Sequence, residues 1–210
     1  EKKIMNSHNG ISLRKSQENI KDTRKRLGLI KKNIKVFGIV GLLIPRKGHM
    51  VLINSIELLV KNNVDNFVVL IEGEGYLKKK LEQEVISKGL NKYCIFIGHE
   101  NNIIDFISAV DFIIFPSIAN EDFPNVILEA MGLGKIVIAS KLSGIPEQIT
   151  DGKTGFLFDP GDEKALAKLM IKVIAEKHNH RLMELESINK FKSFFTDIVS
   201  VKKYISLYEL

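Results

Sequence analysis

Residues 110–131 read VDFIIFPSIANEDFPNVILEAM, and this stretch decides the fold. Its first six residues are an apolar run of the kind that forms a buried parallel strand. The apolar spacing that follows residue 125 predicts a helix. The polar loop between the two would lie at the carboxyl end of the strand, which is the edge where open α/β sheets bind ligands.

The start of that helix predicts an anion-binding site. Pro124 fixes the backbone just before the helix, and Asn125 is a suitable N-cap. The amides of residues 126–128 would then be free to bind an anion, with the helix dipole adding to the attraction. Two carboxylates flank this site, because Glu121 lies in the loop and Glu129 lies about one turn into the helix.

Strands and helices alternate along most of the chain. Further apolar runs predict strands at residues 34–40, 67–71, 93–97, 136–139 and 156–158. Helical spacing is found at residues 50–61, 76–88, 103–109 and 162–176. The fold class is therefore α/β, a doubly wound Rossmann-like parallel sheet with flanking helices, right-handed crossovers and strand order 3-2-1-4-5-6.

The ends of the chain differ from this central part. Residues 1–32 are polar and predict a hinge or linker segment, with a short helix near residues 13–26 that ends at Gly28. Residues 33–178 form the predicted Rossmann-like domain, and residues 179–210 predict a tail of one or two helices. Because the chain begins at Glu1 rather than at a methionine, we expect it to be part of a longer protein.

Composition excludes several classes of protein. The chain has 210 residues, of which 45% are hydrophobic, and no apolar run reaches the roughly 18 residues that span a membrane. Its only cysteine, Cys94, lies in an apolar run, so neither a disulfide framework nor a zinc site is expected. The net charge of +6 suits phosphate ligands, but the lysines are not interleaved with aromatic residues, so we expect no nucleic-acid partner.

Two more loops would share the binding edge of the sheet. After the first strand, Gly41 would let a ligand approach the backbone, and Lys47 could place its ammonium group on a phosphate. Arg46 would either add a second cation or point into solvent. After the third strand comes Gly98-His99-Glu100, where His99 could stack on a ligand, hydrogen-bond to it, or be an ordinary loop residue.

These motifs together resemble the retaining GT-B glycosyltransferases of family 4, also called group 1. Glu121 and Glu129 match the E-x7-E motif of that family within EDFPNVILEAM. Residues 41–48, 73–75, 144–147 and 151–155 match further family elements in the same order, and residues 9–12 match the element that precedes the second domain. The resemblance implies that the chain is the C-terminal, donor-binding half of such an enzyme, beginning at the hinge.

The resemblance also implies roles for individual residues. Glu129 would bind the ribose of a sugar nucleotide, and Glu121 would face the donor sugar. Backbone groups would line the sugar and diphosphate at Phe123, Pro124, Asn125 and Val126. The nucleobase would lie against His99 and Glu100.

One position departs from the family pattern. The family clamps the diphosphate with an Arg and a Lys in the loop after the first strand. Lys47 matches the Lys, but Leu42 occupies the position of the Arg. The departure puts donor affinity, and with it activity, in question.

The function implied is transfer of a sugar from a UDP- or GDP-sugar to a glycan or lipid-linked acceptor held by an absent N-terminal domain, with Glu121 and Lys47 at the reacting centre. The chain alone is therefore expected to bind the donor but to be inactive. We expect no metal or other cofactor, because a helix N-terminus and a lysine can neutralise a diphosphate. The setting implied is the cytoplasm, with contact at the inner face of a bacterial membrane. The alternatives are a non-catalytic glycosyltransferase-like subunit and a sugar-nucleotide epimerase.

Overall fold

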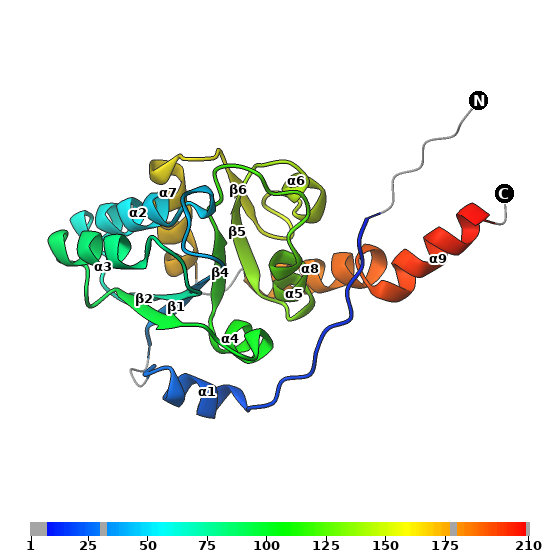
Figure 1. The fold of residues 1–210 in the computed structure, drawn as a ribbon, viewed down its shortest axis with the longest axis horizontal. Helices are drawn as coiled ribbons and strands as arrows, with labels where there is room; N and C mark the ends of the chain where they lie inside the picture. The colour runs from blue at the N-terminus through cyan, green and yellow to red at the C-terminus, as the bar shows by residue number, and fades with distance from the viewer. Residues whose placement is uncertain (1–7, 30–32, 177–179, 209–210) are drawn as a thin grey trace.

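The computed structural model describes residues 8–29, 33–176 and 180–208, and a six-stranded parallel sheet lies at its centre (Figure 1). The strand order β3-β2-β1-β4-β5-β6 confirms the predicted order. The strands are β1 (Lys35–Val40), β2 (Phe67–Glu72), β3 (Cys94–Gly98), β4 (Phe112–Phe115), β5 (Ile136–Ser140) and β6 (Phe156–Phe158).

Helices cover both faces of the sheet. They are α1 (Ile20–Arg26), α2 (His49–Lys61), α3 (Lys78–Ser87), α4 (Ile103–Ala109), α5 (Asn125–Gly132), α6 (Ile145–Gln148), α7 (Glu163–Ala175), α8 (His180–Phe194) and α9 (Asp197–Tyr208), with a short 3-10 helix η1 (Pro45–Lys47) before α2. Side chains of α2, α3 and α7 pack on one face, and those of α4, α5 and α8 pack on the other.

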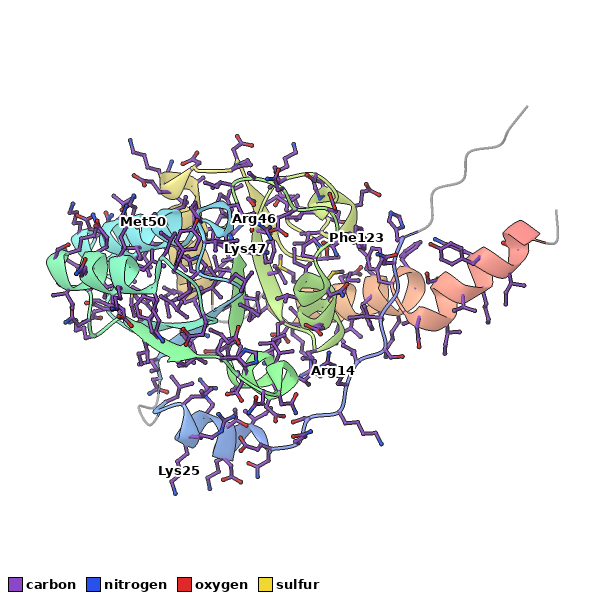
Figure 2. The ribbon with its side chains drawn as sticks, viewed as in Figure 1. Arg14, Lys25, Arg46, Lys47, Met50 and Phe123 are labelled. Carbon is purple, nitrogen blue, oxygen red and sulfur yellow. The ribbon has the colours of Figure 1, made fainter. Side chains whose placement is uncertain are left out.

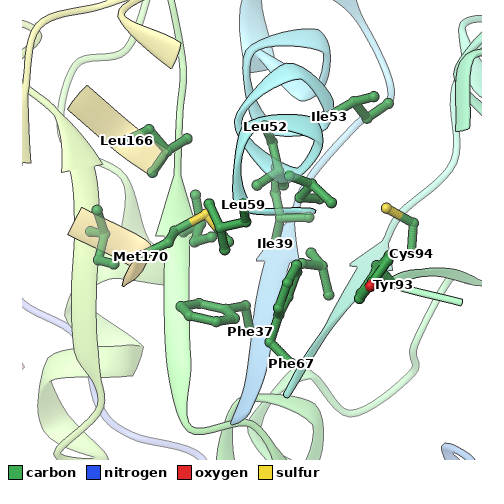
Figure 3. Close-up of a cluster of buried hydrophobic side chains, with 14 of the residues drawn as sticks. Phe37, Ile39, Leu52, Ile53, Leu59, Phe67, Tyr93, Cys94, Leu166 and Met170 are labelled. Carbon is green, nitrogen blue, oxygen red and sulfur yellow. The ribbon is translucent and has the colours of Figure 1, made fainter. Parts of the chain in front are cut away.

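Alternation along β1 shows why one sheet can carry two cores. Phe37 and Ile39 point to the face covered by α2 and α7, where they meet Leu52 and Met170 (Figure 3). Val36 and Val40 belong to the opposite cluster. Because successive strand residues face opposite sides, a strand that is apolar at nearly every position is buried on both faces.

Several predicted boundaries differ from the structure by one or two residues, and the start of the first helix differs by more. Hydrogen bonds of two aspartates bear on the starts of α1 and β4. The first helix begins at Ile20 rather than near residue 13, because Asn19 is its N-cap and accepts the Asp22 amide at Oδ1 at 3.0 Å. Before the cap, Asp105 accepts hydrogen bonds from Ser16 Oγ at 2.6 Å and from the Gln17 amide at 2.9 Å. Strand β4 begins at Phe112 rather than at residue 110. There the Asp111 amide donates to the Val36 carbonyl at 2.8 Å, and the Asp111 carboxylate accepts the Val36 amide at 2.8 Å.

The C-terminal tail forms two helices, α8 and α9, and only part of its apolar side is buried. Phe191 and Phe195 pack into the core, whereas Phe194, Ile198, Tyr204 and Ile205 are exposed. Helix α9 extends away from the sheet (Figure 1). Cys94 is buried as expected, and burial raises the pKa of its thiol to about 12. In the ranges described, no helix is both long and apolar enough to cross a bilayer.

A close backbone contact joins the loops that follow β1 and β4. Gly48 has a φ of +71°, and a Cβ atom there would lie 1.8 Å from the Pro116 carbonyl oxygen. The Ile118 amide donates to the Arg46 carbonyl at 2.8 Å, so the two loops are also joined by a hydrogen bond. Only glycine allows this approach, because both the positive φ and the short distance exclude a side chain.

We expect Gly48→Ala to lower the free energy of unfolding by at least about 2 kcal/mol, because it adds a steric clash to a left-handed backbone. The matched control is Gly89→Ala, where φ is +67° and nothing lies within 4 Å of the added Cβ. The control should lose only about 1 kcal/mol, which is the conformational cost alone. Urea unfolding of both variants measures the difference, and equal losses would contradict the proposed contact.

Candidate functional site

One carboxylate oxygen brings together the loops that follow β1 and β4. Glu121 is buried, and its Oε1 accepts hydrogen bonds from Arg46 Nη1 at 2.8 Å and from Ser117 Oγ at 3.0 Å. Lys47 Nζ lies 2.6 Å from the same atom. A buried carboxylate is costly unless it is paired, and here two cations and a hydroxyl compensate it.

Arg46 and Lys47 therefore both point toward Glu121. Arg46 Nη1 also donates to the Asn120 carbonyl at 3.0 Å, so the guanidinium does not point into solvent. Lys47 Nζ lies 5.0 Å from the centre of the Phe115 ring, and its side chain passes Gly41. Figure 2 shows Arg46 and Lys47 close together, with Phe123 on the side of α5 and α6. Leu42 is 56% exposed and takes no part in this group.

The N-terminus of α5 differs by one residue from the prediction. Pro124 occupies the N-cap position, no side chain caps the helix, and Asn125 is the first helical residue. The predicted N-cap role of Asn125 was therefore wrong. The Ile127 amide donates to the Pro124 carbonyl at 3.2 Å, so it is not free as predicted. In an α-helix that starts here, Asn125 and Val126 carry the amides without an intrahelical acceptor.

Glu129 lies one turn into α5 and is half-buried. Burial raises the pKa of its carboxyl, and the positive charge of Arg14 acts in the opposite direction. The neighbouring residue Leu13 packs against Gly132 on the same helix, where a Cβ atom would lie 2.6 Å from Leu13 Cδ1. The segment before the first strand therefore passes along α5 beside Glu129.

The loop after β3 is held by a residue that the sequence did not single out. Glu72 ends β2, is buried, and accepts the Glu100 amide at Oε1 at 3.0 Å. His99 Nδ1 lies 3.4 Å from the same oxygen, and the His99 side chain is 72% exposed. Burial raises the pKa of Glu72. A lone glutamate at the end of an apolar strand was the signal in the sequence, but its partner could not be predicted.

The predicted site residues thus fall into three groups at one edge of the sheet. Gly41, Arg46, Lys47 and Glu121 meet at the ends of β1 and β4. Asn125, Val126 and Glu129 lie on the first turns of α5, and His99 and Glu100 follow β3. The side chain of Phe123 turns aside and stacks on His8, with ring centres 5.2 Å apart.

Two other features lie outside these groups. Among the residues that the structure describes, no cluster of three or more metal-ligating side chains is found. A hollow of about 450 Å³ lies between β6 and α7, lined in part by Lys141, Asp159 and Lys168. It does not include any of the predicted donor residues.

Comparison with known proteins matches residues 20–187 to the family described as glycosyl transferases group 1. The chain is 31% identical over 173 residues to the capsular polysaccharide biosynthesis glycosyltransferase CapM of Staphylococcus aureus, covering 81% of this chain and 45% of CapM. It is 28% identical over 204 residues to the Escherichia coli UDP-Gal:alpha-D-GlcNAc-diphosphoundecaprenol alpha-1,3-galactosyltransferase, covering 95% and 52%. The chain therefore spans about half the length of these two relatives.

Two solved structures share the fold. The C-terminal domain of LpcC, a glycosyl transferase group 1 family protein from Francisella tularensis, aligns with a TM-score of 0.75 and 25% identity, covering 86% of this chain and 94% of that domain. Anabaena HepE in complex with UDP-glucose aligns with a TM-score of 0.82 and 27% identity, covering 93% of this chain and 54% of HepE. These matches confirm the predicted C-terminal half of a GT-B fold.

A buried histidine beside Lys47 leads to a prediction about pH. His49 is 2% exposed, and neither ring nitrogen has a hydrogen-bond partner among the described residues. Burial, with a smaller effect of the Lys47 charge, lowers its pKa to about 4. In the unfolded chain the group would titrate near pH 6.5, so between these values the unfolded state binds more protons and stability falls as the pH falls.

We expect protonation of the His49 imidazole to lower the free energy of unfolding by about 3 kcal/mol between about pH 7 and about pH 4. His49→Leu should lose less stability over that range than the wild type, because it has no imidazole to protonate. Chemical unfolding at a series of pH values measures both slopes, and titrating carboxylates contribute equally to each. His99→Gln, at an exposed histidine, is the control, and parallel slopes for wild type and His49→Leu would contradict the prediction.

Proposed function

The chain belongs to the group 1 glycosyl transferases, and from that premise we propose that it binds a UDP-sugar and transfers the sugar with retention of anomeric configuration. The observation that carries the proposal is the convergence of Arg46 and Lys47 on Glu121, at the carboxyl edge of the sheet. UDP is preferred to GDP as the nucleotide because HepE, a relative of similar fold, was solved with UDP-glucose.

The two cations would bind the diphosphate of the donor. As the bond between the sugar and the diphosphate breaks, negative charge develops on the leaving phosphate oxygen. Positively charged groups already aimed at that position stabilise the transition state more than the ground state. The free amides of Asn125 and Val126, at the positive end of α5, would add to this stabilisation.

The two glutamates would have different tasks. Glu129 is half-buried on α5 and would accept hydrogen bonds from the ribose hydroxyls. Glu121 is held by Arg46, Lys47 and Ser117, so it would orient the donor sugar and the cations rather than act as a nucleophile. The acceptor, a glycan or lipid-linked sugar, would approach the same face of the donor sugar from a further domain of a longer protein, at the cytoplasmic face of a bacterial membrane.

The main alternative is a non-catalytic subunit that has lost the diphosphate clamp, and the position of Arg46 helps to decide between the two functions. Leu42 favours that alternative, since it replaces the family's Arg. Arg46 opposes it, because its guanidinium contacts the same carboxylate oxygen as Lys47. We propose that Arg46 supplies the second cation. An epimerase would convert the donor without an acceptor, so product analysis with an acceptor present separates it from a transferase.

The first prediction concerns the nucleotide. Calorimetric titration of the chain should give saturable UDP binding, and Glu129→Ala should weaken it at least about tenfold, or about 1.4 kcal/mol. The control is Glu186→Ala, which removes an exposed carboxylate from α8 and should leave the affinity unchanged. No saturable binding of UDP at millimolar concentration would overturn the proposed function.

The second prediction concerns the clamp. Arg46→Gln should lower the affinity for both UDP and inorganic pyrophosphate by about tenfold, since it removes a charge-assisted contact to the diphosphate. Adding Leu42→Arg to that variant should recover affinity, because it restores a cation at the family's position. Lys168→Gln, at an exposed lysine of α7, is the charge-matched control. Unchanged pyrophosphate affinity in Arg46→Gln would show that Arg46 serves only to neutralise Glu121.

A further inference from the structure

We propose that residues 8–26 form a strap that positions the donor site, with Arg26 acting on the loop after β3 and His8 acting on the loop after β4. The inference rests on the proposed function, because the residues that the strap touches are proposed donor residues. The contacts between the strap and the donor loops join segments that are far apart in the sequence, so no local pattern predicts them.

Arg26 braces the loop after β3 from outside. Its Nη1 donates to Glu100 Oε2 at 2.7 Å, and its Nε donates to Glu18 Oε2 at 3.0 Å within the strap. The Glu100 side chain is only 12% exposed. Glu72 holds the amide of Glu100 from inside the sheet. The loop is thus fixed on two sides, while the exposed His99 between them faces solvent.

The middle of the strap is bound to the helices beneath it. The Asp105 carboxylate on α4 accepts Ser16 Oγ at 2.6 Å, the Gln17 amide at 2.9 Å and the Glu18 amide at 3.3 Å. Asp105 is buried and the strap residues that donate to it are more exposed, so these hydrogen bonds are partly shielded from solvent. Farther along the strap, Arg14 lies near the lower end of α5 (Figure 2), where its charge acts on Glu129.

His8 forms the other end of the strap. Its ring stacks on Phe123 at 5.2 Å with an interplanar angle of 20°, and Nε2 lies 2.6 Å from Glu147 Oε2. The Ser200 hydroxyl donates to the His8 carbonyl at 3.1 Å, and the Ile11 amide donates to the Phe195 carbonyl at 2.9 Å. Phe123 also contacts the ring of Phe195, with centres 5.6 Å apart, so the loop that carries Glu121 and Phe123 packs against both the strap and the C-terminal segment.

These contacts would order the donor loops before the donor arrives. A loop that must become ordered on binding loses affinity by the cost of that ordering, and bracing it in advance removes the cost. The two ends brace different parts of the donor site. Arg26 acts beside the proposed base loop, and His8 acts beside the loop that faces the sugar, whereas neither touches the Arg46–Lys47 pair.

The test measures the affinity of the chain for three ligands, which are pyrophosphate, UDP and UDP-glucose. Arg26→Gln should lower the affinity for UDP and for UDP-glucose to a similar extent, by about fivefold, and leave the affinity for pyrophosphate unchanged. His8→Ala should lower the affinity for UDP-glucose by about fivefold and the affinity for UDP by less, because the substitution makes the loop after β4, on the sugar side, less ordered. Lys25→Gln makes the same charge change as Arg26→Gln at an exposed position on α1 (Figure 2), and should change none of the three.

A double variant checks that Arg26 acts through Glu100. The double variant Arg26→Gln, Glu100→Gln should bind UDP no more weakly than the weaker-binding of the two single variants, since both substitutions break the same Arg26–Glu100 contact. The proposed role of the strap is contradicted if the wild type binds UDP but neither Arg26→Gln nor His8→Ala changes the relative affinities for the three ligands. It is equally overturned if each variant weakens all three ligands alike, which is the result of general destabilisation. Failure of the wild type to bind UDP would instead reject the proposed function.

Discussion

The whole arrangement depends on the pairing of one buried carboxylate, Glu121, with Arg46 and Lys47. This pairing requires that β1 and β4 be neighbours, because the cations follow β1 and the carboxylate follows β4. The sheet supplies that condition by reversing its strand order between them. The loops diverge at such a reversal, so a ligand can enter there. The close approach of Gly48 to Pro116 then fixes the distance between the loops.

In the proposed site, Arg46 would supply the charge that the family pattern places at the position of Leu42. Leu42 is exposed and contributes nothing to the carboxylate, while Arg46 reaches it from the short helix η1. A guanidinium that arrives from a different backbone position can serve the same electrostatic purpose, since Coulomb attraction depends on distance rather than on sequence position. With Glu121 holding both cations in place, little reorganisation would be needed when a diphosphate binds.

Sequence reasoning succeeded where the physical signal was local. The alternation of apolar runs and helical spacing predicted all six strands, and the doubly wound fold class predicted their order. The roles of Glu121 and Glu129, which come from the E-x7-E spacing, stay a prediction. Sequence reasoning was less accurate at the start of α5, where Pro124 rather than Asn125 is the N-cap. Proline before a helix and asparagine as its cap are both common, so local preference could not separate them. Glu72 and Asp105 were missed because their partners lie 28 and 89 residues away.

The sequence by itself determined the kind and order of the elements, because periodicities of about two and about 3.6 residues decide which side chains share a face. It also determined the family, since the motif residues occur in a fixed order along the chain. Only the tertiary structure decided which charges meet. Arg46 with Glu121, Arg26 with Glu100 and His8 with Phe123 are pairs separated by more than 70 residues. Such contacts arise from the packing of whole elements, and no local sequence pattern specifies them.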